Sequence, residues 1–183
     1  MNVVLIGMKH CGKSTIGAAL ARRWGCPFYD VDEMIEATHA CESGRRLTAR
    51  EIFVQFGEDY FHKIEGRVVC ELYMKLFEPD STHVVALGGR TAMNEGIREL
   101  LDGIGLTVYL QVAPEELLAR VKRAGMPPFL DEADPVGDFL LLCRQREPQY
   151  ERLADLTVNL DGLDVEAAVD AVARCIEEHK DAR

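Results

Sequence analysis

The chain has 183 residues and a formal net charge of −10, which favours one domain and disfavours a general nucleic-acid binder, because no basic stripe is available to contact phosphates. It has no run of 18 apolar residues that would predict a membrane span, and it enters its first strand without the charged segment of a secretory signal. Its six cysteines are far apart and show no C-x-x-C spacing, so we expect reduced thiols in the cytoplasm rather than a disulfide framework or a zinc site.

The first motif is a glycine-rich loop between a predicted strand and a predicted helix. Val3–Ile6 is an aliphatic run typical of a buried strand, and residues 7–14 fit the pattern G-x-x-x-x-G-K-[ST]. Glycines allow backbone N–H groups to approach a polyphosphate, and the helix that opens at Lys13 adds its N-terminal donors. In this pattern the lysine reaches the β- and γ-phosphates, and Ser14 places its hydroxyl on Mg²⁺. Chance alone should produce the full pattern in only about one per cent of chains of this length. We therefore expect nucleotide binding by Gly7, Lys9, Cys11, Gly12, Lys13, Ser14 and Thr15.

Two carboxylates follow a predicted second strand. The first helix should end at Gly25, and residues 28–32 should then form a short strand that ends in Asp30 and Asp32. Ligands bind at the carboxyl edge of open parallel sheets. Because strand residues alternate, the two side chains should point in different directions, one towards Mg²⁺ and the other towards a substrate hydroxyl. The alternative interpretation is a solvated strand end with a helix cap.

Residues 33–64 are predicted to form short helices and loops. Thr48, with Glu51 three residues later, forms a capping box at one helix start. Gly57 and Glu58 interrupt the pattern before a longer helix that begins near Tyr60. The apolar stripe of that helix is more typical of a core than of a functional site.

Strands and helices alternate through the rest of the chain. The turn Gly88-Gly89-Arg90 follows the third strand, so it should lie beside the phosphate loop. This alternation predicts an α/β fold with a parallel sheet and right-handed crossovers. We expect strands at 84–87, 106–112 and 156–160. We also expect four helices: one capped by Asn94, one from Pro114 to near Arg123, one from about Asp138 to Glu147 before Pro148, and one that begins near Val165.

A long proline-containing loop lies between the fourth and fifth predicted strands. Residues 125–128 and 131–135 cannot form regular helix or strand. A loop of this length in a compact domain is often a lid, and an ordinary surface loop is an equally weighted alternative.

The chain resembles the shikimate kinases, small P-loop proteins related to the nucleoside-monophosphate kinases. The resemblance implies a three-layer fold with a five-stranded parallel sheet in the order 2-3-1-4-5, helices on both faces and a lid. It also implies transfer of the ATP γ-phosphate to the shikimate 3-hydroxyl, a step of aromatic amino acid biosynthesis. The stretches that carry it are the phosphate loop, residues 28–32, Gly57-Glu58 with Phe61 and Glu65, Leu87-Gly88-Gly89, and residues 146–150 with Ala154.

By position, the resemblance implies a role for each matching residue. Asp32 would hydrogen-bond the attacking hydroxyl and could accept its proton, and Arg146 would grip the substrate carboxylate. The other implied roles are Lys13 on the β- and γ-phosphates, Ser14 with Asp30 through water on Mg²⁺, Gly88 and Gly89 at the substrate, and Arg120 stacked on adenine.

Three departures from the family pattern concern the substrate acid. His62 stands where the family has an arginine, Arg90 replaces a glycine, and Pro127-Pro128 replaces the Arg-Pro of the lid. Two of the three expected guanidinium groups are therefore missing, and an imidazole does not fully replace one, because it offers fewer donors. Arg90 could supply charge from another wall or fill the pocket against shikimate, and Arg123 or Lys122 could serve as the lid cation.

We therefore expect an ATP- and Mg²⁺-dependent kinase of a small carboxylated metabolite, with shikimate as the favoured substrate and with His62, Gly88, Gly89, Arg90 and Arg146 around it. Residues 1–183 should form a single P-loop kinase domain, with a lid at about 123–137 and a substrate-binding region at about 32–65. The alternatives are a kinase of another hydroxylated metabolite, a nucleobase or nucleoside kinase, and a nucleotide-binding protein that has lost transfer activity. We expect a monomer whose partner is a small molecule, with no nucleic acid and no membrane.

Overall fold

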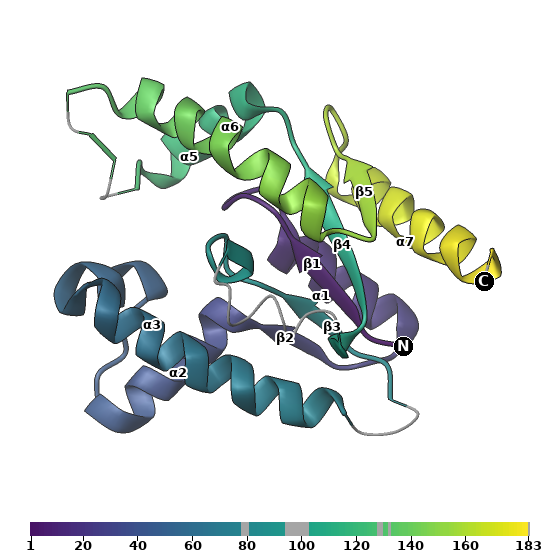
Figure 1. Ribbon diagram of the computed structural model, residues 1–183, viewed down its shortest axis with the longest axis horizontal. Helices are drawn as coiled ribbons and strands as arrows, with labels where there is room; N and C mark the ends of the chain where they lie inside the picture. The colour runs from purple at the N-terminus through teal and green to yellow at the C-terminus, as the bar shows by residue number, and fades with distance from the viewer. Residues whose placement is uncertain (78–80, 94–102, 128–129, 132, 183) are drawn as a thin grey trace.

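The computed structural model describes residues 1–77, 81–93, 103–127, 130–131 and 133–182. Its centre is a five-stranded parallel sheet in the order β2-β3-β1-β4-β5 (Figure 1). This order confirms the predicted one. The strands are β1 (Val3–Ile6), β2 (Phe28–Asp30), β3 (Val84–Ala86), β4 (Leu106–Gln111) and β5 (Leu156–Asn159).

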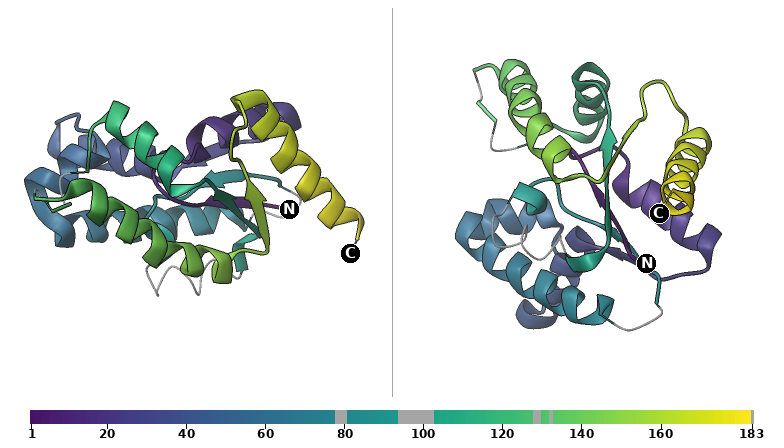
Figure 2. Two further views of the ribbon diagram at one scale, coloured as in Figure 1. Left: turned by 90° about the horizontal axis from the view of Figure 1, so that it is seen from above. Right: turned by 45° about the vertical axis from the view of Figure 1, so that its right-hand side comes forward.

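Helices cover both faces of this sheet. Helices α1 and α7 lie together on one face and α6 lies on the other, while α2 and α3 pack against one another beside β2 (Figure 2). Both termini lie on the right-hand side of the view in Figure 1, and the N-terminal segment contacts the end of α3, where Asn2 Nδ2 donates to the Leu76 carbonyl at 3.0 Å. The helices are α1 (Lys13–Trp24), α2 (Val31–Ser43), α3 (Ala49–Leu76), α5 (Pro114–Ala124), α6 (Pro135–Leu153) and α7 (Val165–Asp181), with a 3₁₀ turn η1 (Thr91–Met93).

The buried central strand β1 leaves its carboxyl end as the position for a binding site. All four of its residues are buried, and it pairs in parallel with both β3 and β4, so Val3 lies opposite Val84 on one side and Leu106 on the other. The sequence of a parallel strand that is covered on both faces is typically a continuous apolar run, as it is here. Polar groups therefore collect beyond its carboxyl end, where the phosphate loop begins.

The prediction that the second strand runs to residue 32 is wrong. Strand β2 ends at Asp30, and α2 begins at Val31. The Asp30 carboxylate accepts the backbone N–H groups of Asp32 at 2.9 Å and of Glu33 at 3.4 Å. Such a bond satisfies donors that a helix start otherwise leaves free, so Asp30 caps the helix and Asp32 lies in its first turn. The alternation argument for these two aspartates therefore does not apply.

The region that follows is more helical than predicted. Helix α2 has 13 residues, and α3 extends over 28 residues with one interruption at Gly57, whose φ of 81° and ψ of 176° are not helical. The break at Gly57 and the capping box of Thr48 and Glu51 were both predicted and are confirmed. The expectation of short helices and loops underestimated the length, because tertiary packing of α2 on α3 extends both.

Helix α6 also exceeds its predicted bounds. It begins at Pro135, where Asp134 caps it by accepting the Gly137 N–H at 2.9 Å, and it continues through Pro148 to Leu153. Pro148 removes one backbone donor, yet the helix continues because Tyr150 beyond it is fully buried, its ring 5.2 Å from that of Tyr109 in β4.

Parts of two predictions lie outside the described residues. These are the helix predicted after Asn94, and Pro128 within the loop at 123–137. Of the helices that the structure does describe, none combines the length and the apolar character that crossing a membrane requires.

Candidate active site

The phosphate loop has the backbone that its glycines predict. Gly7 has a φ of 143° and Gly12 a φ of 110°, a region that residues with a Cβ rarely adopt. A Cβ on Gly7 would also lie 2.8 Å from the carbonyl oxygen of Leu110 in β4. The loop is therefore folded back against the sheet before α1 opens, and His10 shares its positive φ at 67°.

Lys13 lies inside this loop. Its side chain is buried, and its Nζ donates to the carbonyl oxygens of Gly7 at 2.8 Å and Met8 at 2.9 Å, with Cys11 Sγ at 3.7 Å. These contacts hold an ammonium group against the carbonyls of the phosphate loop, at the N-terminus of α1. A buried positive charge at a helix N-terminus is suited to a polyphosphate.

One of two pockets at this edge, the phosphate-loop pocket, surrounds that loop. Arg120 closes one side of it, donating to the carbonyl oxygens of His10 at 3.2 Å and Cys11 at 3.3 Å and to the Glu116 carboxylate. Gly7 and Cys11 belong to the loop, but they are buried and do not line this pocket. Its lining is Lys9, His10, Gly12, Lys13, Ser14, Thr15, Asp30, Asp32, Leu87, Gly89 and Arg120.

A second pocket, the apolar pocket, adjoins the first. Aromatic and aliphatic side chains form much of its wall: Met8, Phe53, Phe61, Pro127, Phe139 and Leu142. Charged side chains enter it from several elements: Lys9, Asp32, Arg50, His62, Glu65, Arg90 and Arg146. The two pockets share Lys9, His10, Asp32 and Gly89. A few polar groups in an apolar recess are typical of a small-molecule site.

Asp32 stands at the junction of the two pockets. Burial raises the pKa of its carboxyl above the ordinary value of 3.8, and the charges of Asp30 and Glu65 raise it further, while those of Lys9 and Lys13 oppose the shift. A carboxyl whose pKa is raised towards neutrality is better matched to accepting a proton than an ordinary aspartate. The geometry therefore places a candidate base between a phosphate site and a small-molecule site.

Gly88 leaves the space that Asp32 occupies. A Cβ at residue 88 would lie 2.9 Å from Asp32 Oδ1 and 2.6 Å from Thr91 Oγ1. A Gly88→Ala variant should therefore displace the Asp32 carboxylate and lower turnover by at least tenfold, about 1.4 kcal/mol of transition-state stabilisation, while nucleotide affinity is retained. Steady-state kinetics together with nucleotide titration measures both effects.

The matched control for that substitution is Gly66→Ala. Gly66 lies within α3 with open space around its Cβ position, so alanine there should leave turnover unchanged and raise helix stability by about 0.5–1 kcal/mol. Equal kinetics for the Gly88→Ala variant and the unaltered protein would contradict the role given to this close approach.

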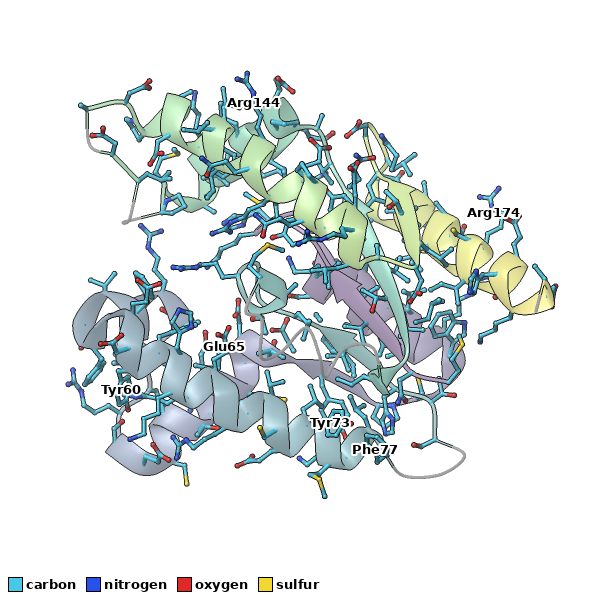
Figure 3. The ribbon with its side chains drawn as sticks, viewed as in Figure 1. Tyr60, Glu65, Tyr73, Phe77, Arg144 and Arg174 are labelled. Carbon is cyan, nitrogen blue, oxygen red and sulfur yellow. The ribbon has the colours of Figure 1, made fainter. Side chains whose placement is uncertain are left out.

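His62 belongs to a charge network that the sequence argument did not foresee. Its Nδ1 lies 3.0 Å from Glu65 Oε2 and its Nε2 lies 3.3 Å from Glu58 Oε1. Arg90 donates to the same Glu58 oxygen at 2.6 Å. Glu65 is buried on the inner side of α3 (Figure 3) and accepts the Thr91 hydroxyl at 2.6 Å. The spacings i−4 and i+3 around His62 were the signal available in the sequence.

Arg146 enters the apolar pocket from α6. Burial lowers the pKa of its guanidinium, and the charge of Arg90 lowers it further, whereas Tyr150 has the opposite effect. A desolvated cation next to another cation is stabilised by an incoming anion. Arg144, two residues earlier, instead projects outward from α6 (Figure 3). The Tyr150 hydroxyl donates to the Gly89 carbonyl, which ties α6 to the turn after β3.

The residues suggested as lid cations lie elsewhere. Lys122 and Arg123 are exposed in the last turn of α5. Neither contributes to the lining of the two pockets as far as the described residues define it. The predicted site residues Asp32, His62, Gly88, Gly89, Arg90 and Arg146 do come together, all in the apolar pocket.

A phosphate loop at the edge of a 2-3-1-4-5 parallel sheet, with a small-molecule pocket that shares an aspartate with it, defines a P-loop kinase of small molecules. The family model described as Shikimate kinase matches residues 9–177. The chain belongs to the shikimate kinase family.

Relatives and solved structures of the family are similar over nearly the whole chain. The shikimate kinase of Rhodopseudomonas palustris is 36% identical over 97% of this chain and 81% of its own length. The structure of shikimate kinase from Acinetobacter baumannii in complex with shikimate has a TM-score of 0.82 and 28% identity, covering 98% of this chain and 94% of that one. Shikimate kinase from Aquifex aeolicus has a TM-score of 0.76 and 30% identity, with 98% of each chain covered.

Proposed function

We propose that this protein transfers the γ-phosphoryl group of ATP to the 3-hydroxyl of shikimate, with the residues of the two pockets in the roles that follow. The observation that carries this proposal is the position of Asp32 in both pockets, where an acceptor hydroxyl and a terminal phosphate would meet. The apolar wall suits a carbocyclic ring, and the arginines beside it suit a carboxylate.

The phosphate-loop pocket binds the nucleotide in this proposal. Lys13 contacts the β- and γ-phosphate oxygens, and Arg120 packs against adenine. Catalysis of phosphoryl transfer depends chiefly on positioning and on stabilising charge, and a buried ammonium fixed by two carbonyls is already in position for both.

Ser14 and Asp30 fit the requirements of Mg²⁺. They contribute a hydroxyl and a carboxylate to one pocket, and Mg²⁺ is usually held by one or two such oxygen ligands together with water and substrate phosphates. The cap bonds engage Asp30 Oδ1 alone, and Oδ2 makes no hydrogen bond among the described residues. When bound, the ion would neutralise charge on the phosphates.

Asp32 acts on the acceptor in this scheme. It orients the attacking hydroxyl by hydrogen bonding and accepts its proton as the bond to phosphorus forms. Gly88 and Gly89 leave room for the substrate beside it. The carboxylate of the substrate is held at the other end of the apolar pocket by Arg146 and Arg90, with His62 on the α3 wall.

The direct test of this proposal is ADP release from ATP and Mg²⁺ across a panel of hydroxylated acids that includes shikimate. We expect release with shikimate and a phosphorylated product by mass spectrometry. The Lys13→Ala protein provides the background rate for each acid. Release with another acid and none with shikimate would refute the proposed substrate, and nucleotide binding without release for any acid would favour a protein that has lost transfer activity.

Replacing Arg90 by glycine tests whether this arginine binds the substrate or only fills the pocket. In the Arg90→Gly variant, Glu58 loses its partner at 2.6 Å and keeps only His62 at 3.3 Å, so more of its negative charge acts on the pocket. We expect weaker shikimate binding by calorimetry, by roughly 1.5–3 kcal/mol for a charged hydrogen bond. Arg144→Ala is the control, because that arginine projects away from the site (Figure 3). A gain in shikimate affinity by Arg90→Gly would mean that Arg90 only fills the pocket.

A further inference from the structure

Arg50 lies in the apolar pocket although nothing in the sequence pattern marks it. It is the second residue of α3, directly after the Thr48 cap and Ala49, and its side chain reaches across to the segment that follows α5. Its Nη1 donates to the Gly125 carbonyl at 3.2 Å and its Nη2 to the Met126 carbonyl at 2.6 Å. A helix-start arginine on the surface has no local reason to adopt this orientation, so the contact is tertiary.

No carboxylate of the described residues pairs with Arg50, and both of its hydrogen-bond partners are neutral carbonyls. Arg90, in the same pocket, is instead paired with Glu58 at 2.6 Å. A guanidinium carries five N–H donors, and two hydrogen bonds leave three of them for a ligand. Bidentate pairing with a carboxylate is also stronger than bonding to neutral carbonyls, so an acid ligand would compete well for this group.

Three guanidinium groups therefore enter the apolar pocket from three different walls. Arg146 comes from α6, Arg90 from the turn after β3, and Arg50 from the start of α3. Two of these guanidinium groups, those of Arg90 and Arg50, lie near His62 and Pro127, the two positions where the family pattern has an arginine and this chain does not. Arg90 shares Glu58 with His62, and Arg50 bonds the two carbonyls that immediately precede Pro127. Arg90 and Arg50 thus bring positive charge to the pocket from other elements.

We infer that Arg50 is a specificity-determining residue of this enzyme, which binds the carboxylate of the acid substrate together with Arg146 and Arg90. Resting on the proposed function, this inference assigns to α3 a contact with the substrate acid. A carboxylate removed from water requires hydrogen-bonded cations around it, and Arg50 supplies one that no carboxylate in the described part of the chain pairs with. Its bonds to the carbonyls of residues 125 and 126 hold the side chain where it lines the pocket.

The test compares two substrates that differ in one charge, shikimate and its neutral carboxamide. For the Arg50→Ala variant we expect the KM for shikimate to rise roughly tenfold or more, the loss of one charged hydrogen bond, with kcat changed much less. Turnover of the carboxamide should differ much less between the variant and the unaltered protein, because its neutral carbonyl oxygen accepts a weaker hydrogen bond from Arg50 than a carboxylate does. Arg50→Lys should recover part of the shikimate affinity.

Arg46→Ala is the matched control, since Arg46 is exposed in the same segment and lines neither pocket as described. Thermal melting should show all three variants folded. An equal loss with both substrates would assign Arg50 to holding residues 125 and 126 alone, and would overturn this inference, as would an unchanged KM for shikimate. If the unaltered protein neither binds nor phosphorylates shikimate, the proposed function fails and this inference fails with it.

Discussion

Replacing Lys13 by alanine should reduce phosphoryl transfer several hundredfold while the protein stays folded. The substitution removes an ammonium that the structure holds 2.8 and 2.9 Å from two carbonyls of the phosphate loop, at the start of α1. By analogy with the removal of one preorganised donor, about 3–4 kcal/mol of transition-state stabilisation should be lost, or a rate decrease of several hundredfold. Steady-state ADP release measures the decrease directly.

Stability must be followed in the same variant, because the Gly7 carbonyl loses the Lys13 donor, whereas the Met8 carbonyl still accepts the Cys11 N–H at 3.2 Å. Each unsatisfied buried acceptor costs about 1–3 kcal/mol, so the melting temperature should fall without loss of cooperativity. Arg22→Ala is a suitable control, since it removes one positive charge from the exposed far end of the same helix. Near wild-type turnover by Lys13→Ala would refute the assignment of the loop.

Replacing Asp32 by asparagine should reduce turnover far more than nucleotide affinity. The amide keeps the shape of the side chain but cannot accept the proton of an attacking hydroxyl, and general-base catalysis typically contributes a factor of about 10²–10⁴. Stability should not decrease, because burial already disfavours the charged form of this group. Nucleotide titration beside the rate measurement separates the two effects.

The pH profile gives a second measurement on Asp32. Its pKa lies above the ordinary value of 3.8, and only the ionised form can accept a proton, so kcat/KM should fall as the pH decreases through that raised pKa. The Asp32→Asn variant should lack this acid limb, whereas Glu33→Gln, one residue further along α2 and exposed, should retain it. If nucleotide binding collapses in Asp32→Asn, Asp32 belongs to the metal and Asp30 takes the substrate role.

Local patterns predicted the scaffold well. The aliphatic run at Val3–Ile6, the glycines of the loop and the lysine after them are consecutive in the chain, and their conformations follow from local sterics and strand burial. The capping box at Thr48 and the stop at Gly25 are likewise local, since each depends on hydrogen bonds within a few residues. These features were correctly placed because no distant residue is needed to explain them.

Predictions failed where a contact between residues far apart in the chain decided the outcome, and at Asp30, where a helix cap formed instead of a strand. The second strand was expected to continue to Asp32, but the Asp30 carboxylate accepts the N–H groups of Asp32 and Glu33 and so caps a helix that begins at Val31. Pro148 was expected to end α6, but the buried ring of Tyr150 holds the helix together beyond it. The extent of α2 and α3 depends on their mutual packing, which composition does not reveal.

The sequence by itself determined the phosphate loop, the sheet order through the family resemblance, and the set of residues at the sheet edge, because these depend on short-range conformation and on the burial of apolar strands. Only the tertiary structure decided how charge is distributed in the apolar pocket. Glu58 pairs with both His62 and Arg90, and Arg50 meets the carbonyls of residues 125 and 126 across the pocket. Electrostatic interactions depend on distances between side chains far apart in the chain and on their desolvation, and both exist only once the elements have packed.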